Sequence, residues 1–221
     1  MTYETQRKRK VAIFDLDETL IQSSLKLRTD VANTLRKLGV EISPEEVKGD
    51  WYKLAESYGI NRYVFDAKFT ESRKTWEQSL KDGEVPIYHG VYNLLDKLKK
   101  EGVELVLLSK SKTEYTQQKL DYFDLNKYFS DVETVHPKEP SKYQGARNLM
   151  ERLNPGTISE LSFIGDKAED VAPVLKMRKE YNIPVTHGIL IRRNLKERVT
   201  QNLPSFNVIK SLEELPKIIG V

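Results

Sequence analysis

The sequence predicts an α/β protein: a Rossmann-like three-layer core with a parallel sheet, plus an inserted α-helical cap domain. Short, continuously apolar segments alternate with amphipathic helical patterns, and this alternation favours the core. Several of the apolar segments end abruptly at polar residues. A long stretch with helical periodicity follows the first apolar segment, which favours the insertion.

The expected strands are apolar runs of the kind that a parallel sheet buries on both faces. The first run ends at Asp15, and the second ends at Ser109. Strands that alternate with helices imply parallel connections and helices on both faces of the sheet. We expect the strands at 11–14, 103–108, 132–135, 161–164, 188–191 and 206–209.

Helical patterns lie between these strands. Apolar residues within 91–98 repeat at the i, i+3, i+4, i+7 spacing of an amphipathic helix, and Gly102 is placed to end it. The segment 143–153 has the same periodicity, and a closing helix is expected at 212–218.

The stretch 21–86 breaks this rhythm because it contains no convincing buried strand. It is too long for a loop, since structureless loops beyond ~15 residues are uncommon. We therefore assign 1–20 and 87–221 to the core, and the stretch between them to a helical cap inserted after the first strand. The helices expected within the cap are 23–38, 44–58 and 61–80.

The composition excludes several classes of function. The chain has no cysteine among its 221 residues, which rules out disulfides, thiolate metal sites and cysteine nucleophiles. Its 36 basic and 33 acidic residues give a formal charge of +3, so binding to nucleic acid or a membrane by bulk charge is not indicated. No apolar stretch approaches the ~20 residues of a membrane span, and we expect a cytoplasmic protein. These features leave the oligomeric state open.

Polar residues stand at four places at or beyond the ends of expected strands. In open α/β sheets, ligands bind at the carboxyl ends of the strands. We therefore expect these four groups, which are far apart in the sequence, to form one site. They are Asp15 with Asp17, Ser109, Lys138, and Asp166 with Asp170.

Asp15 and Asp17 are expected to point the same way, because residues two apart in an extended segment share a face. Adjacent carboxylates repel each other, and a hard divalent ion removes that repulsion. Mg²⁺ favours carboxylate oxygens together with water and substrate phosphate. Gly165 allows a close approach of the backbone beside the later pair of carboxylates. The expected metal-binding residues are Asp15, Asp17, Asp166 and Asp170.

These motifs resemble those of the haloacid dehalogenase superfamily. The segment 14–20, Phe-Asp-Leu-Asp-Glu-Thr-Leu, is similar to its first motif, and 107–109, Leu-Leu-Ser, to its second. The segment 138–141, Lys-Glu-Pro-Ser, resembles the third motif, and 165–170 resembles the fourth. The resemblance implies a Rossmann-like core, a helical cap over the active site and membership of the phosphatase branch.

The resemblance also implies roles for the acidic residues. Asp15 would attack phosphorus and form an aspartyl-phosphate. Asp17 would protonate the leaving oxygen and then activate water for the second step. Asp15, Asp166 and the carbonyl of Asp17 would hold Mg²⁺, with Asp170 close by.

Ser109 and Lys138 would bind the phosphoryl oxygens and offset their charge. The third motif departs from the frequent Lys-Pro-x-Pro, and Lys142, one helical turn later, is an alternative for the lysine. We prefer Lys138 because Pro140 then falls near its usual place. The expected phosphate-binding residues are Asp15, Leu16, Asp17, Ser109, Lys110 and Lys138.

Asp17 separates two chemistries of the superfamily. Displacement of halide needs no proton, whereas the alkoxide leaving group of a phosphate monoester benefits from an acid. We therefore predict a Mg²⁺-dependent phosphatase that acts on a small phosphorylated metabolite. Two alternatives remain: a phosphomutase of the same superfamily, and a non-catalytic binding protein on this fold.

Overall fold

The computed structural model of the protein describes residues 8–72, 76–136, 141–193 and 206–221. The chain divides into two compact units, Met1–Leu20 with Tyr88–Val221, and Ile21–Ile87. The second unit is an insertion, because the chain leaves the first unit after Leu20 and returns to it at Tyr88. None of the helices in the described ranges combines the length and the apolar character needed to cross a membrane.

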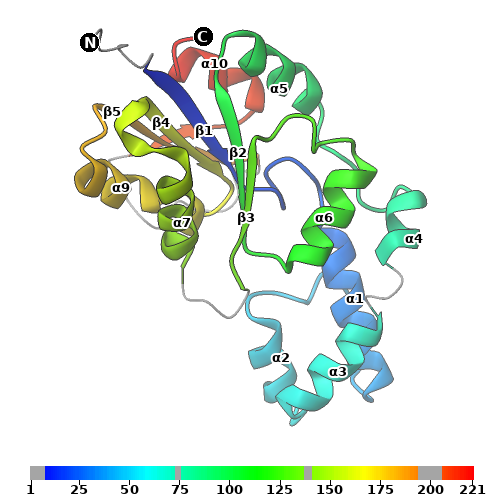
Figure 1. The fold of residues 1–221 in the computed structure, drawn as a ribbon. Helices are drawn as coiled ribbons and strands as arrows, with labels where there is room; N and C mark the ends of the chain where they lie inside the picture. Colours follow the sequence, from blue (N-terminus) through cyan, green and yellow to red (C-terminus); the bar gives the residue numbers. More distant parts are fainter. Residues whose placement is uncertain (1–7, 73–75, 137–140, 194–205) are drawn as a thin grey trace, which may run out of the picture. The chain divides into compact units, whose positions relative to one another are not determined.

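The first unit is built on a parallel sheet with the strand order β3-β2-β1-β4-β5-β6 (Figure 1). In the register of this sheet, Phe14 on the central strand lies opposite Leu107 on one side and Ile164 on the other. The residues that follow these three positions therefore meet at one edge of the sheet. The strands are β1 (Arg9–Phe14), β2 (Glu104–Ser109), β3 (Asp131–Thr134), β4 (Ile158–Gly165), β5 (Val185–Ile191) and β6 (Asn207–Ile209).

Helices cover both faces of this sheet and make the three layers of a Rossmann-like core. Figure 1 shows α7 and α9 on one side of the sheet and α5 and α6 on the other. The helices of this unit are α5 (Val91–Lys100), α6 (Thr113–Tyr122), α7 (Tyr143–Leu153), α8 (Ala168–Val171), α9 (Pro173–Tyr181) and α10 (Leu215–Ile218).

The alternation of side chains along β1 explains why the sheet needs two helical layers. Val11 and Ile13 belong to one buried cluster with Leu149 of α7 and Met177 of α9. Phe14 points to the opposite face and is fully buried there. Each such side chain contributes about 1.5–3 kcal/mol when it is removed from water, so both faces of the central strand stabilise the fold.

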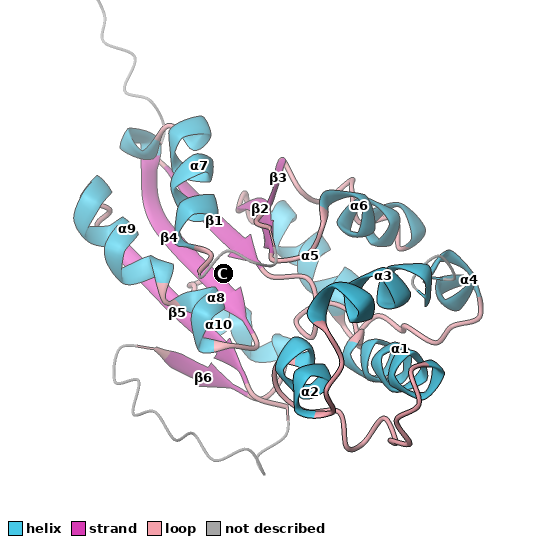
Figure 2. Ribbon diagram, turned by 90° about the horizontal axis from the view of Figure 1, so that it is seen from below, coloured by secondary structure: helices cyan, strands magenta, loops and turns pink. Residues whose placement is uncertain are grey.

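The inserted unit is helical (Figure 2) and has a core of its own, which includes Val31, Leu35, Phe65 and Phe69. Its two ends pair with each other, because Ile21 and Ile87 form an isolated antiparallel bridge. Its helices are α1 (Ser24–Lys37), α2 (Trp51–Ser57), α3 (Arg62–Ser72) and α4 (Trp76–Lys81).

Two of the expected cap helices differ from those in the structure. The helix expected from residue 44 begins only at Trp51, because the Asp50 side chain accepts hydrogen bonds from the amides of Tyr52 and Lys53 and caps α2 there. The helix expected at 61–80 corresponds to α3 and α4, and residues 73–75 between them lie outside the described residues.

In the core, the main differences lie in elements that carry polar residues. Helix α6 was not expected, because Thr116 and Lys119 interrupt the apolar stripe on its buried face. Strand β4 begins at Ile158, earlier than expected, because its backbone pairs with β1 even where its side chains are polar. The closing helix is short, with a 3-10 turn over Leu212–Glu214 before α10.

Candidate active site

Asp15 stands directly after the central strand, at the carboxyl edge of the sheet. Its amide donates to the carbonyl of Ile164 on β4 at 2.9 Å, so the backbone is held in line with the sheet. Thr19 Oγ1 donates to Asp15 Oδ2 at 3.1 Å, because the chain turns back after Leu16. The side chain of Asp15 is therefore both buried and oriented.

Three carboxylates meet at this edge, as the order of the strands requires. Asp15, Asp166 and Asp170 each offer an oxygen that lies within 4.8 Å of the others. Asp166 follows β4, and Asp170 reaches the cluster from α8. The amide of Lys167 donates to Asp170 Oδ2 at 2.8 Å and helps to fix its position.

The close approach of Asp170 depends on Gly165. A Cβ atom at Gly165 would lie 2.7 Å from both Cγ and Oδ2 of Asp170, a separation that real Cβ atoms do not adopt. Glycine at this position is therefore required by the packing of the carboxylate.

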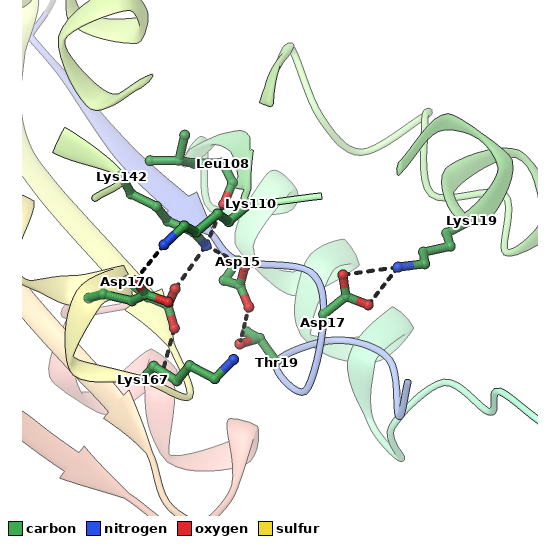
Figure 3. A network of polar contacts seen from close by, with 10 residues as sticks. Asp15, Asp17, Thr19, Leu108, Lys110, Lys119, Lys142, Lys167 and Asp170 are labelled. Atoms are coloured by element: carbon green, nitrogen blue, oxygen red, sulfur yellow. Dashed lines mark hydrogen bonds and ion pairs between the residues drawn. The ribbon is translucent and has the colours of Figure 1, made fainter. Parts of the chain in front are cut away.

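Lys142 is the cation at the centre of the cluster. Its ammonium forms ion pairs with Asp15 and, at 2.8 Å, with Asp170 Oδ1, and it donates to the carbonyl of Leu108 at 2.9 Å (Figure 3). The residue is only 2% exposed. Lys138, which we preferred for the active-site lysine, lies outside the described residues, and its role stays a prediction.

The carboxyl groups of this cluster have strongly perturbed proton affinities. Burial raises the pKa of Asp15 to about 7, with a smaller contribution from the charge of Asp170 and against the opposing effect of Lys142. Burial also raises the pKa of Asp166 to about 8, and the charge of Asp15 adds to this rise. Burial alone would lower the pKa of Lys142, but Asp15 and Asp170 outweigh it, so the net shift is upward and the lysine stays charged.

This donor set fits a hard divalent cation. Its ligands are carboxylate oxygens, which Mg²⁺ prefers. Lys142 offsets one of the three negative charges of Asp15, Asp166 and Asp170, and a divalent ion would balance the two that remain. Burial is the main cause of the raised pKa values, and the repulsion between these carboxylates, which a divalent ion would remove, adds to it.

Ser109 is the last residue of β2 and is 1% exposed. Within the described parts of the chain, its hydroxyl oxygen has no hydrogen-bond partner. A buried hydroxyl without a partner costs about 1–3 kcal/mol. This cost is offset if the hydroxyl donates to a ligand oxygen.

Asp17 does not join the three carboxylates in the way that its spacing from Asp15 suggests. Its carboxylate accepts from Lys119 Nζ on α6, at 2.6 Å to Oδ1 and 2.9 Å to Oδ2 (Figure 3). Residues two apart share a face only in an extended strand, and β1 ends at Phe14, before either aspartate. The expected contact of Asp17 with a metal through its carbonyl stays a prediction.

The remaining phosphate-binding candidates have contacts of their own. The carbonyl of Leu16 accepts from the amide of Leu20 at 2.9 Å. Lys110 forms an ion pair with Glu169 at 3.0 Å. A phosphate contact for Leu16 and Lys110 stays a prediction.

Arg193, two residues after the end of β5, binds the turn that follows Asp17. It donates to the carbonyl oxygens of Glu18 at 2.6 Å and Thr19 at 2.8 Å, and its guanidinium lies 3.5 Å from the centre of the Tyr88 ring. The Tyr88 hydroxyl donates to Glu18 Oε2 at 3.0 Å. These contacts hold a residue in a backbone conformation that L side chains rarely adopt.

Sequence reasoning missed Thr19, Lys119 and Arg193. Thr19 lies four residues after Asp15 in the same motif, a spacing that suits a turn. Lys119 lies three residues after Thr116 and four before Phe123, on the buried side of α6. Prediction of a helix over this segment would therefore have placed a lysine on its buried face. No comparable pattern singles out Arg193.

Comparison with known proteins agrees with this architecture. The family model for haloacid dehalogenase-like hydrolases matches residues 12–178. The chain is 24% identical to a phosphoglycolate phosphatase of Vibrio parahaemolyticus, over 98% of this chain and 99% of that protein. Its fold is similar to that of a predicted phosphatase from Clostridium acetobutylicum, with a TM-score of 0.72, 24% identity and coverage of 97% and 100% of the two chains. A haloacid dehalogenase-like hydrolase from Streptococcus pneumoniae has a TM-score of 0.71 at 17% identity, with coverage of 95% and 98%.

The chain therefore belongs to the haloacid dehalogenase-like hydrolase family. The predicted α/β class, with a Rossmann-like core and an inserted helical cap, is confirmed by the parallel sheet and by these structural relatives.

Proposed function

We propose that this enzyme is a Mg²⁺-dependent phosphatase that hydrolyses a small-molecule phosphate monoester through an aspartyl-phosphate on Asp15. The observation that carries the proposal is the position of Asp15, whose carboxylate lies beside those of Asp166 and Asp170 and in an ion pair with Lys142.

Asp15, Asp166 and Asp170 are the proposed ligands of Mg²⁺. When bound, the ion would draw electron density from the phosphoryl group and offset the negative charge that meets the nucleophile. Lys142 keeps Asp15 and Asp170 in place, and Thr19 orients the other oxygen of Asp15. The nucleophile is thus preorganised by residues of the chain itself.

In the proposed first step, an oxygen of Asp15 forms a bond to phosphorus while the bond from phosphorus to the leaving oxygen breaks. Asp17, in its protonated form, gives its proton to that oxygen and the alcohol departs. In the second step, Asp17 takes a proton from water as the water oxygen attacks phosphorus. The bond from phosphorus to Asp15 then breaks and inorganic phosphate is released.

Ser109 and Lys142 are the proposed partners of the transferring phosphoryl group within the described residues. The Ser109 hydroxyl is buried and suited to donate to a phosphoryl oxygen. Lys142 supplies a fixed positive charge that is itself buried, and a buried charge has a larger effect than one in water.

The proposal is tested by measuring release of inorganic phosphate from p-nitrophenyl phosphate and from a panel of phosphorylated metabolites. Activity is expected with Mg²⁺, and it is expected to disappear after chelation and in Asp15→Asn. Asp121→Asn, which changes an exposed aspartate on α6, is the matched control and should retain full activity. If the wild type and Asp15→Asn release phosphate equally from every ester, the proposal is wrong.

Product analysis with sugar phosphates separates hydrolysis from phosphoryl transfer between sugar hydroxyls. A phosphatase releases inorganic phosphate in proportion to the substrate consumed. A phosphomutase returns an isomeric sugar phosphate and little free phosphate.

A further inference from the structure

We propose that Lys119 is a positioning residue that holds the carboxylate of Asp17 in one orientation for proton transfer. This inference rests on the proposed function, in which Asp17 exchanges a proton with the leaving oxygen and then with water. Lys119 would act on the reaction only through Asp17.

The contact between the two residues is bidentate and buried on one side. Lys119 is 1% exposed, and its ammonium donates to both oxygens of Asp17, at 2.6 and 2.9 Å. The side chain of Asp17 is 26% exposed, so part of it is accessible to solvent. A carboxylate that is held in one orientation and is still partly accessible is suited to exchange protons with a bound ligand.

The position of Lys119 on α6 makes a purely structural role costly. Thr116 and Leu120 share the buried side of the helix, where an apolar residue would pack without loss of hydration. Burying an ammonium group is strongly unfavourable unless it is paired. Replacement of such pairs by apolar residues is often neutral or stabilising, so fold stability alone gives little reason for a lysine here.

The loop that carries Asp17 gives a reason for the pair. Asp17 lies three residues beyond the end of β1, where the regular pleat of the strand no longer sets the direction of its side chain. Proton transfer needs a donor within hydrogen-bond reach of the reacting oxygen, and a misplacement of about 1 Å can reduce the rate about 100-fold. The contact from α6 constrains the side chain of Asp17, whereas Arg193 holds the backbone of the turn that follows it.

The test is a double-mutant cycle between Lys119→Met and Asp17→Asn, measured with an alkyl phosphate and with p-nitrophenyl phosphate in the presence of Mg²⁺. Methionine keeps an unbranched side chain, one atom shorter than that of lysine, and removes the charge. We expect Lys119→Met to lower kcat for the alkyl phosphate about 10- to 100-fold with KM little changed, and to lower kcat for p-nitrophenyl phosphate less. In the Asp17→Asn background, Lys119→Met should cause no further loss.

Two further variants separate positioning from packing. Thr116→Val changes a buried residue of the same helix whose hydroxyl has no partner in the described parts of the chain, and it should retain full activity. Lys119→Arg keeps a cation beside Asp17 and should recover part of kcat. Melting temperatures of all variants, measured without substrate, identify any that fail to fold.

Each outcome decides the matter. An unchanged kcat in a folded Lys119→Met overturns the role of Lys119 and leaves the phosphatase proposal intact. An equal loss in the wild-type and Asp17→Asn backgrounds also overturns it, because Lys119 would then act elsewhere. A wild type that is inert on all phosphate esters overturns the proposed function, and the role of Lys119 with it.

Discussion

Lys142 Nζ lies 2.8 Å from Asp170 Oδ1, and the same ammonium forms an ion pair with Asp15. One buried cation therefore joins a carboxylate that follows β1 to a carboxylate on α8. The two aspartates are far apart in the sequence, and the lysine reaches them from the start of α7. The cluster depends on all three segments of chain, so each can be tested separately.

Removal of Lys142 is expected to disable the enzyme. Lys142→Met would leave the carboxylates of Asp15 and Asp170 without their cation, and kcat/KM should fall by about 100-fold or more. Lys176→Met, which changes an exposed lysine on α9, is the control and should behave as wild type. The same assay on Lys138→Met decides which lysine serves the site. If Lys138→Met is inactive and Lys142→Met is active, our assignment of Lys142 is wrong.

Gly165→Ala is expected to weaken metal activation. The new methyl group would lie 2.7 Å from Asp170 Cγ, so the carboxylate must move away from Asp15 and Asp166. We expect a higher Mg²⁺ concentration for half-maximal activity, measured by titration of the metal at saturating substrate. Gly156→Ala is the matched control, because the nearest atom to its new methyl group would lie 3.7 Å away. Equal activation curves for the two variants would contradict the prediction.

The stability of the metal-free protein should fall as pH rises. The carboxyl pKa values of Asp15 and Asp166 rise from the ordinary 3.8 to about 7 and about 8, so both groups bind protons more tightly in the folded state. The contribution of this proton binding to the free energy of unfolding is fully present below the ordinary pKa, and it is lost as the pH rises from 4 to 8. Mg²⁺ replaces the protons, so it should raise the melting temperature more at about pH 8.5 than at about pH 5. A stabilisation by Mg²⁺ that is independent of pH would contradict this linkage.

Arg193→Lys is expected to loosen the turn after Asp17. Lysine keeps the charge but loses the planar fork that donates to the carbonyls of Glu18 and Thr19, and it loses the stacking on Tyr88. We expect a decrease of about 1 kcal/mol in the free energy of unfolding and a lower kcat. Chemical denaturation and steady-state kinetics measure the two effects. Arg178→Lys, on the exposed side of α9, should change neither, and an active, fully stable Arg193→Lys would show that the turn does not need this clamp.

Much of the core was predictable, because buried strands of a parallel sheet are continuous apolar runs and amphipathic helices have a regular period. All six strands were expected near their observed positions. Helix α6 was missed because its buried side includes Thr116 and Lys119, whose burial depends on partners elsewhere in the fold. Propensity and periodicity describe local structure, and they do not register a charge that is paired across 102 residues.

By itself, the sequence determined the class of fold and identified the acidic residues at the strand ends as candidate site residues. The reason is that the topology of a parallel sheet brings all such ends to one edge. The tertiary structure alone decided how the basic residues are shared: Lys142 with Asp15 and Asp170, and Lys119 with Asp17. The physical reason is that the two kinds of interaction act between residues at different separations along the chain. Strand and helix formation follow from neighbours along the chain, whereas an ion pair requires two side chains to lie within a few ångströms in space, and that separation is set only when the layers pack.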